Sequence, residues 1–291
     1  MTRGKALANL DEPLRLQTGP FDDMAAAYDA SFTTTAYGKC LRALVWERLD
    51  AAFGASQHVL EIGCGTGEDA VHLASRGVRV LATDPSMPML RVAAEKAERA
   101  GCAERIEFRC VPMEKLGAEF SGERFDGVCS NFGAINCAPR LDVVVAEVAS
   151  LLNPGARLVW VVMGRNVPWE WVWFLARGDR RKAFRRWRKG GVGWKGLQVF
   201  YPTPADLERT LAPYFAPLRR RSLGLVLPPS YAAGSLEGSP RLLAALTHVE
   251  RAAQRWQPLA ALADHYIFEA RRLPAGELEA AHDLAEAPRR A

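Results

Sequence analysis

One short segment constrains the fold more strongly than any other part of the chain. Residues 58–62 (His-Val-Leu-Glu-Ile) are typical of a buried strand, and they lead directly into the turn of residues 63–67 (Gly-Cys-Gly-Thr-Gly). The next residues carry apolar side chains at helical spacing as far as Gly77, which indicates a helix. A strand, a glycine-rich turn and a helix in this order form a nucleotide-binding corner of α/β proteins.

The alternation of strands and helices continues beyond this corner. Short apolar segments alternate with helical patterns, and such alternation predicts a mostly parallel sheet covered by helices on both faces. Further strands are predicted at residues 78–83, 106–111, 125–130, 157–162, 218–227 and 263–270. The predicted fold class is therefore α/β.

The glycine turn also restricts its ligand. Its spacing is G-x-G-x-G, and Glu68 and Asp69 follow at once in the first turn of the helix. These two carboxylates suit a helix N-terminus but would repel a pyrophosphate, so the ligand is expected to carry no phosphate there. A P-loop is excluded because no Gly-Lys-Ser/Thr follows. Asp84 ends the second strand, where a carboxylate can accept hydrogen bonds from ribose hydroxyls.

Composition places the chain among ordinary globular proteins. Hydrophobic residues make up 49% and charged residues 24%, which excludes disordered, collagen-like and coiled-coil chains. No run approaches the ~18 apolar residues of a membrane span, and the residues after Met1 do not resemble a secretory signal. The six cysteines form no CxxC pair, as expected of reduced thiols. These features predict a cytoplasmic location.

The positive charge is concentrated in one segment. The net charge is +5, but residues 165–200 hold ten Lys and Arg residues against only Glu170 and Asp179. Five of the eight tryptophans lie in the same window. The remainder of the chain is net negative, so the basic character belongs to one insertion.

Residues 59–67 (Val-Leu-Glu-Ile-Gly-Cys-Gly-Thr-Gly), together with Asp84, resemble the class I S-adenosylmethionine-dependent methyltransferases. The branch that they resemble most includes quinone-biosynthesis and small-molecule enzymes. The resemblance covers residues 20–163 well and the two closing strands more loosely. It implies a Rossmann-like, seven-stranded sheet with an antiparallel last strand, helices on both faces and substrate-lid insertions. It also implies S-adenosyl-L-methionine as the cofactor, for a transfer that needs no metal.

The resemblance further implies which residues contact the cofactor. The glycine turn would face its methionine part, Glu61 would support the turn, and Asp84 would hold the ribose. Residues 21–29 are similar to the N-terminal helix that covers the cofactor, and residues 130–133 match the loop beside the reactive methyl. The candidate cofactor-binding residues are Tyr28, Glu61, Gly63, Cys64, Gly65, Gly67, Asp84, Met113, Glu114 and Asn131. Pro112 stands where members often carry an Asp that contacts adenine, so Met113 and Glu114 are left to read the adenine edge.

Several candidates also have a purely structural interpretation. Cys64 can be a small filler, Asp84 an N-cap for the next helix, Glu61 a buried structural carboxylate, and Tyr28 a core residue. No catalytic residue is assigned. His248 and His265 are weak candidates for a general base because they lie near the expected substrate wall.

These patterns divide the chain into five parts. They are an N-terminal arm (1–19), a cofactor-binding core (20–163), a basic, Trp-rich lid insertion (164–203), the C-terminal part of the fold (204–273) with a second insertion (228–260), and a tail (274–291). In the lid insertion, a helix from Pro168 is expected to be followed by a second, basic helix with Phe184 and Trp187 on one face.

The lid insertion is expected to set the substrate, and three interpretations stay open. It can be a structural lid with a solvated arginine face. Its aromatic residues can instead contact an apolar substrate or a membrane surface. A nucleic-acid groove is disfavoured because the rest of the chain is net negative.

The expected reaction is methyl transfer to an oxygen or carbon of a small, apolar or aromatic metabolite. Branches that methylate amides or adenine carry an Asn/Asp-Pro-Pro-aromatic turn, whereas residues 130–133 here are Ser-Asn-Phe-Gly. The alternatives are an RNA methyltransferase that uses the basic insertion and a non-catalytic, cofactor-binding regulatory protein. The oligomeric state is left open.

Overall fold

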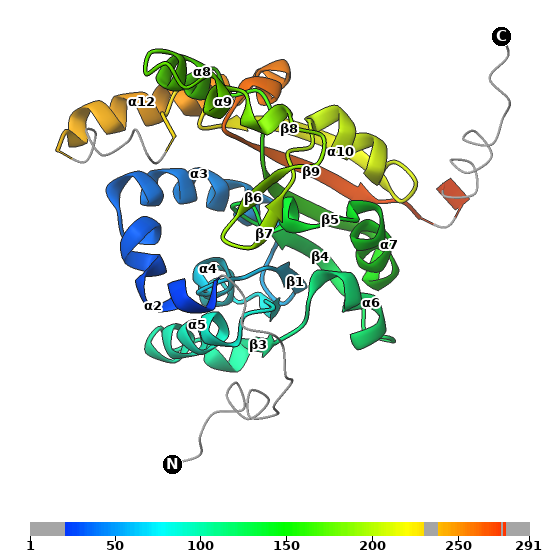
Figure 1. Ribbon diagram of the computed structural model, residues 1–291. Helices are drawn as coiled ribbons and strands as arrows, with labels where there is room; N and C mark the ends of the chain where they lie inside the picture. The colour runs from blue at the N-terminus through cyan, green and yellow to red at the C-terminus, as the bar shows by residue number, and fades with distance from the viewer. Residues whose placement is uncertain (1–20, 230–237, 275, 278–291) are drawn as a thin grey trace, which may run out of the picture.

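The computed structural model describes residues 21–229, 238–274 and 276–277. Its centre is a seven-stranded sheet in the order β3-β2-β1-β4-β5-β9-β8 (Figure 1). The strands are β1 (His58–Ile62), β2 (Arg79–Thr83), β3 (Ile106–Arg109), β4 (Phe125–Ser130), β5 (Leu152–Met163), β8 (Phe215–Leu223) and β9 (His265–Arg272).

The direction of the strands agrees with the predicted fold class. Strands β1 to β5 pair in parallel, and β9 pairs antiparallel with both β5 and β8. The predicted strands 58–62 and 125–130 have the bounds observed for β1 and β4. The closing strands are shifted by two to four residues relative to the prediction, because their sequences mark the turns between them weakly.

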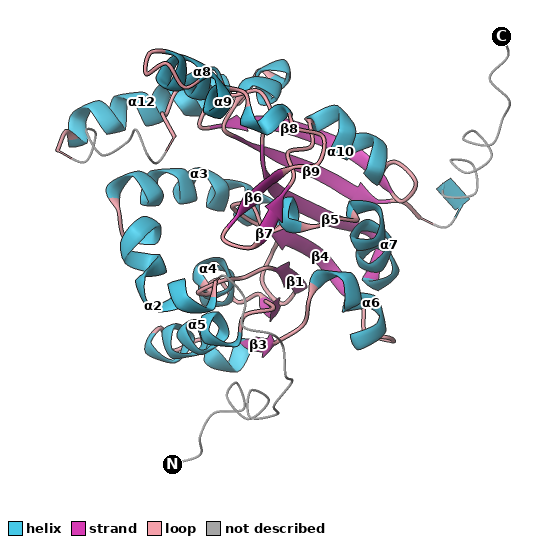
Figure 2. Ribbon diagram, in the orientation of Figure 1, coloured by secondary structure: helices cyan, strands magenta, loops and turns pink. Residues whose placement is uncertain are grey.

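Helices cover both faces of the sheet (Figure 2). Helices α3 (Ala36–Ala52), α4 (Glu68–Ser75) and α5 (Met87–Arg99) pack into one buried cluster, and α7 (Leu141–Leu151) and α10 (Pro204–Leu211) pack into another. Alternate residues of β1 serve the two clusters, with Val59 in the first and Leu60 and Ile62 in the second. Glu61 shares the face of Val59, toward α3 and α4.

Shorter elements connect these layers. They are η1 (Asp22–Met24), α2 (Ala25–Tyr28), η2 (Asp29–Thr33), η3 (Ala103–Arg105), η4 (Met113–Lys115), α6 (Leu116–Glu119), η5 (Ile135–Cys137) and η8 (Gln257–Leu262). The first three bring residues 21–33 across the carboxyl ends of the central strands.

The lid insertion (residues 164–203) folds as two short helices and a hairpin. Helix α8 (Pro168–Leu175) begins at the predicted proline, and α9 (Arg180–Ala183) follows. The prediction that one second helix carries both Phe184 and Trp187 is wrong, because α9 ends at Ala183 and Trp187 lies in η6 (Arg185–Trp187). Within η6, Arg186 turns inward to two buried carboxylates, which a regular solvated helix face would not allow.

The hairpin was not expected from the sequence. Strands β6 (Val192–Trp194) and β7 (Leu197–Val199) pair antiparallel around Lys195 and Gly196. Both turn residues have positive φ angles, of 47° and 85°, as in a two-residue type I′ turn.

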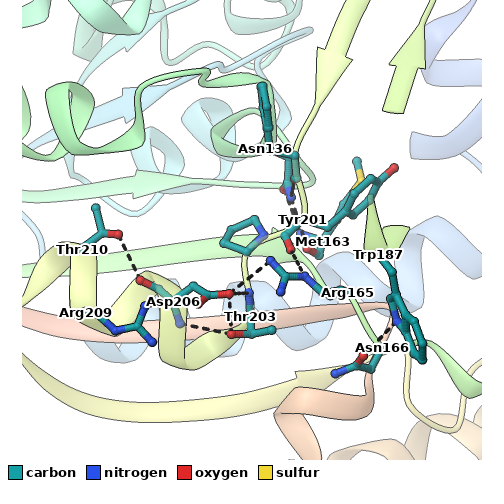
Figure 3. A network of polar contacts seen from close by, with 12 residues as sticks. Asn136, Met163, Arg165, Asn166, Trp187, Tyr201, Thr203, Asp206, Arg209 and Thr210 are labelled. Carbon is teal, nitrogen blue, oxygen red and sulfur yellow. Dashed lines mark hydrogen bonds and ion pairs between the residues drawn. The ribbon is translucent and has the colours of Figure 1, made fainter. Parts of the chain in front are cut away.

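A network of polar contacts fixes the end of the lid insertion to the sheet (Figure 3). The Asn136 side chain donates to the carbonyls of Met163 and Phe200 at 3.2 and 2.7 Å. Arg165 donates to the carbonyl of Tyr201 at 2.9 Å and pairs with Asp206, the capping-box residue of α10, at 3.2 Å. Both ends of the lid insertion are therefore held at the end of β5.

The second insertion is only partly described. Residues 230–237 lie outside the described part of the chain, as do the N-terminal arm and most of the tail. Helix α12 (Pro240–Ala253) packs against α3, with Leu243 buried and Val249 exposed. Across the described residues, we find no helix with the length and apolar character of a membrane span.

Candidate cofactor and substrate site

A cavity of about 570 Å³ opens at the carboxyl ends of the parallel strands. Ligands of open α/β sheets bind at this edge, and the volume is that of a small-molecule pocket. Residues from the glycine turn, the N-terminal segment, the end of β9 and the lid insertion line it. Its wall is mostly apolar and includes Phe21, Met24, Met89, Met113, Phe132, Met163, Val192, Trp194 and Val199.

Glycine is needed at two positions of the turn for different structural reasons. Gly67 has a φ angle of 74°, and a Cβ there would lie 2.6 Å from the Cβ of Ala93, so the close approach of α4 and α5 requires glycine. Gly65 has a φ of 52°, but a Cβ there would meet no atom within 4 Å. Since Gly65 also lines the cavity, it leaves space that a ligand can fill.

Asp84 stands opposite the turn at the end of β2. Its Oδ2 accepts from the backbone N–H of Gly65 and its Oδ1 from that of Ser86, both at 2.9 Å. Burial raises the pKa of Asp84 to about 6, although the two backbone hydrogen bonds act in the opposite direction. A carboxylate has about four acceptor positions, so this one can still accept from the hydroxyls of a ribose.

Two buried acceptors near the turn have no partner within the described chain. Asn131 lines the cavity and donates through Nδ2 to Asp69 at 2.7 Å, while its Oδ1 is orphaned. Oε2 of Glu61 is also orphaned, and burial followed by the charge of Asp69 raises the pKa of Glu61 well above its usual range. Orphaned acceptors beside an open cradle fit a ligand that brings hydrogen-bond donors or positive charge.

Asp69 organises the residues beneath this cradle. Its Oδ1 accepts from Arg42 at 2.8 Å and from Trp46 at 2.7 Å, and its Oδ2 accepts from Asn131. The Arg42 guanidinium also lies 4.9 Å from the centre of the Phe132 ring. Burial alone would raise the pKa of Asp69, but Arg42 and these hydrogen bonds lower it, so the carboxylate stays ionised. The network thus orients Asn131 and Phe132 in the cavity wall.

The N-terminal segment closes one side of the cavity. Phe21, Met24 and Tyr28 are spaced by three and four residues, so they share one face, and all three line the cavity. The segment is attached to the core by Asp29, which accepts from Thr66 at 2.6 Å and pairs with Lys96 at 2.8 Å.

The hairpin of the lid insertion meets this segment. The ring centroids of Phe21 and Trp194 are 5.5 Å apart. Two segments that are far apart in the sequence therefore meet in the wall of the cavity.

The opposite end of the cavity carries charged and polar groups. Arg185, Arg186 and Tyr201 come from the lid insertion, His265 is the first residue of β9, and Asp264 directly precedes it. His265 pairs with Met163 of β5 in the sheet register, which places it at the same edge as the glycine turn.

Comparison with known proteins agrees with this geometry. Residues 59–155 match the family model of a methyltransferase domain. The chain is 34% identical over 157 residues to a demethylmenaquinone methyltransferase of Thermobifida fusca, covering 52% of this chain and 63% of that protein. It is also 34% identical over 113 residues to a ubiquinone biosynthesis O-methyltransferase of Chromobacterium violaceum, covering 38% and 47%. Residues 59–155 are thus a methyltransferase domain of the class I S-adenosylmethionine-dependent type.

A solved structure shares the fold of this chain. The CcbJ methyltransferase of Streptomyces caelestis superposes with a TM-score of 0.57 at 18% identity, covering 88% of this chain and 99% of that one. The chain spans 63% and 47% of the lengths of the two curated relatives named above, and the family model ends at residue 155, before the lid insertion begins. The family model therefore supports the assignment of the core only. For the lid insertion, the structural contacts of its own residues are the evidence.

The predicted site residues fall into two groups. Those that line the cavity are Tyr28, Gly63, Gly65, Asp84, Met113, Asn131 and His265. Those that are not among its lining residues are Glu61, Cys64, Gly67, Glu114 and His248. Cys64 packs in the core cluster, Gly67 is the N-cap of α4, and His248 is exposed on α12. Pro112 is the N-cap of η4, and next to it Met113 presents its side chain to the cavity.

Sequence reasoning missed several residues of the candidate site. Arg42, Trp46 and Asp69 form the support network, and only Asp69 stood next to a recognised motif. Arg185 and Arg186 were counted as part of a basic surface, although Arg186 is 7% exposed. Their spacing resembles that of any solvated basic segment, so the sequence held no signal that singled them out.

Proposed function

We propose that this protein is an S-adenosylmethionine-dependent methyltransferase that methylates an oxygen or carbon of a small, apolar or aromatic metabolite. The observation that carries the proposal is one cavity whose two ends are lined by different kinds of residues. Asp84, Gly65 and Asn131 stand at one end, and Met163, Tyr201 and His265 at the other.

The residues at the first end fit the cofactor. Asp84 would accept from the ribose hydroxyls, Gly65 would let the cofactor approach the backbone, and Asn131 would accept from the ammonium group. Tyr28 and Met24 would cover it. When bound, S-adenosylmethionine supplies a methyl group on a positively charged sulfur atom.

The residues at the second end fit an acceptor with an apolar body. Phe132, Met163 and Trp194 offer aromatic and thioether surface, while Arg185 and Tyr201 offer polar contacts. A cavity filled by both reactants excludes water and aligns them, which supplies much of the acceleration in a displacement at carbon.

The contacts of the lid insertion weigh against the RNA alternative. Arg185 and Arg186 pair with Glu170, Arg165 with Asp206, and Lys182 with Asp179. Four of the ten basic side chains of residues 165–200 are thus paired with carboxylates within the protein. Contact of residues 165–200 with a membrane surface stays a prediction; the exposed side chains of Trp169, Val172 and Trp187 favour it.

The proposal includes a cytoplasmic location. All six cysteines of the sequence are free thiols in the structure, which suits a reducing compartment.

Calorimetric titration with S-adenosylmethionine tests the cofactor assignment. Asp84→Ala should weaken binding by ~1.5–3 kcal/mol, or roughly ten- to over a hundredfold, because a charged acceptor is lost. Asp142→Ala is the matched control, since Asp142 is an exposed carboxylate on α7. Equal affinity of all three proteins, or no binding by folded wild type, contradicts the proposal. Methylation assays on extracts then separate an enzyme from a non-catalytic binding protein.

A further inference from the structure

A chain of buried charges runs from the lid insertion to a histidine in the cavity wall. Nη2 of Arg186 donates to Oδ1 of Asp264 at 2.6 Å and to Oε1 of Glu170 at 2.9 Å. The other oxygen of Asp264 lies 3.1 Å from Nδ1 of His265. Arg186, Glu170 and Asp264 are each less than a tenth exposed. Asp264 therefore bridges an arginine of the insertion and an imidazole of the sheet.

This bridge favours one nitrogen of His265 as the reactive one. Nδ1 is buried 3.1 Å from Oδ2 of Asp264 and has no aligned hydrogen-bond partner, and an ionised carboxylate can only accept a hydrogen bond. We therefore infer that the neutral imidazole carries its proton on Nδ1, toward the carboxylate, which leaves the lone pair on Nε2. Because His265 lines the cavity, Nε2 is the nitrogen available to a ligand there.

The surroundings of Asp264 keep it in the ionised form. Burial alone would raise the pKa of Asp264, but the guanidinium of Arg186 and the imidazole of His265 lower it below its usual range. Nη1 of Arg186 is held in turn by the carbonyls of Gly164 and Asp264, at 2.9 and 3.2 Å. An ionised carboxylate in this place orients the imidazole and stabilises it once it is protonated.

The position of His265 suits a role next to the acceptor. It pairs with Met163 on β5 and Leu223 on β8, both apolar, and its ring centroid lies 6.0 Å from that of Phe132. The other charged and titratable groups at this end are Arg185, Arg186 and Tyr201, all from the lid insertion. Arg185 is paired with Glu170, so Asp264 is the carboxylate that His265 contacts directly.

We propose that His265 is the base that accepts the proton of the methyl acceptor, that Asp264 and Arg186 are positioning residues for it, and that the acceptor carries an acidic hydroxyl of the phenol or enol type. The inference rests on the proposed methyl transfer and names the acceptor class for the same cavity. It also gives the lid insertion a chemical task, because Arg186 comes from that segment.

The proton transfer balances within the cavity. The O–H bond of the acceptor breaks, its electron pair stays on the oxygen, and a new N–H bond forms at Nε2 of His265. The resulting imidazolium faces the Asp264 carboxylate, and the proton later leaves to water. A general base of this kind contributes roughly 10²- to 10⁴-fold to the rate, and an acceptor without an acidic proton would not need one.

Nitrogen NMR of the imidazoles tests the dyad without any ligand. With His265→Gln used for assignment, wild-type His265 should show the Nδ1-protonated tautomer near pH 8. Asp264→Asn should shift it toward the Nε2-protonated form, because an amide can donate to Nδ1. The exposed His248 should be unchanged in that variant. An Nε2-protonated wild-type His265, or no change in Asp264→Asn, overturns the positioning role.

A chromogenic phenol tests the proton transfer. With S-adenosylhomocysteine bound, 4-nitrophenol added below its own pKa should show a saturable rise in the phenolate band with wild type and His248→Gln. His265→Gln should abolish the rise, and 4-nitroanisole, which has no acidic proton, should give no signal. An equal rise with His265→Gln, or none with wild type, overturns the inference. Calorimetry with S-adenosylhomocysteine alone distinguishes the two proposals. If the cofactor product does not bind, the proposed function is contradicted, whereas the NMR result on the His265 tautomer is unaffected.

Discussion

Oδ1 of Asp264 accepts a hydrogen bond from Nη2 of Arg186 at 2.6 Å, and this pair joins the lid insertion to the central sheet. The two residues are 78 positions apart in the chain. Arg186 also donates to Glu170 in α8 and to the carbonyl of Gly164. One buried guanidinium therefore links the start of the insertion and its first helix to the residue that precedes β9.

Arg186→Met should destabilise the protein strongly. The change leaves the carboxylates of Glu170 and Asp264 buried with one cation fewer, and breaking a buried pair in this way costs about 3–5 kcal/mol. Chemical denaturation measures the loss. Arg188→Met, at an exposed position two residues on, should change the free energy of unfolding by less than about 0.5 kcal/mol. Equal stability of the two variants would show that the buried pair contributes nothing.

Cofactor affinity should fall as the pH falls through about 6. The pKa of Asp84 is raised to about 6 by burial, so below this pH the carboxyl is protonated and accepts the ribose hydroxyls poorly. The dissociation constant should rise roughly tenfold per pH unit once Asp84 is mostly protonated. Titrations at pH 7.5, 6 and 5 measure this. In Asp84→Asn the dependence should disappear, and its persistence there would assign it to another group.

Ionisation of Asp84 should also make the free energy of unfolding depend on pH, in a direction that its raised pKa fixes. The pKa of Asp84 is higher in the folded protein than in the unfolded chain, where it is about 3.9. The folded state therefore holds the proton more tightly, and this contribution is complete below about pH 4 and is lost as the pH rises through 6. The difference in stability between wild type and Asp84→Asn should shift in favour of the variant between pH 4 and pH 7. A difference that stays constant across this range would contradict the raised pKa.

Alanine at two glycines of the turn should separate folding from binding. Gly67→Ala places a Cβ 2.6 Å from that of Ala93 at a positive φ angle, so it should cost about 2 kcal/mol or more of stability. Gly65→Ala meets no atom within 4 Å, so it should cost only the left-handed strain of about 1 kcal/mol, yet weaken cofactor binding roughly tenfold or more. Thermal melts measure the loss of stability in each variant, and calorimetry measures the change in cofactor affinity. Unchanged affinity in Gly65→Ala would mean that the cofactor does not use the open cradle.

The aromatic contact between Phe21 and Trp194 should slow cofactor release. Trp194→Ala removes a ring pair of 5.5 Å separation, worth about 0.5–1.5 kcal/mol, so the dissociation rate of S-adenosylhomocysteine should rise roughly two- to tenfold. Stopped-flow displacement measures the rate. Trp256→Ala is the control, because Trp256 is 71% exposed and does not line the cavity. If both variants release the cofactor at the wild-type rate, the hairpin does not cover it.

The sequence alone was sufficient for the elements that follow local rules. Strand β1, the glycine turn and α4 were predicted because alternation of apolar residues, positive φ angles and helix stop signals are properties of neighbouring residues. The parallel sheet and the antiparallel last strand were expected as well, and Asp84 could be named because it ends a strand beside the turn. The tertiary structure places Asp84 at hydrogen-bond distance from Gly65, 19 positions away.

Only the tertiary structure decided the lid insertion and the far end of the cavity. The residues around Arg186 have the composition of a solvated basic face, yet two arginines turn inward because Glu170 and Asp264 are buried there and need a cation. The sequence also offered no basis for choosing between His248 and His265, since each lies in an apolar segment. The sheet register places His265 at the cavity. Pattern and propensity are local, whereas the pairing of buried charges depends on which distant segments the fold brings together.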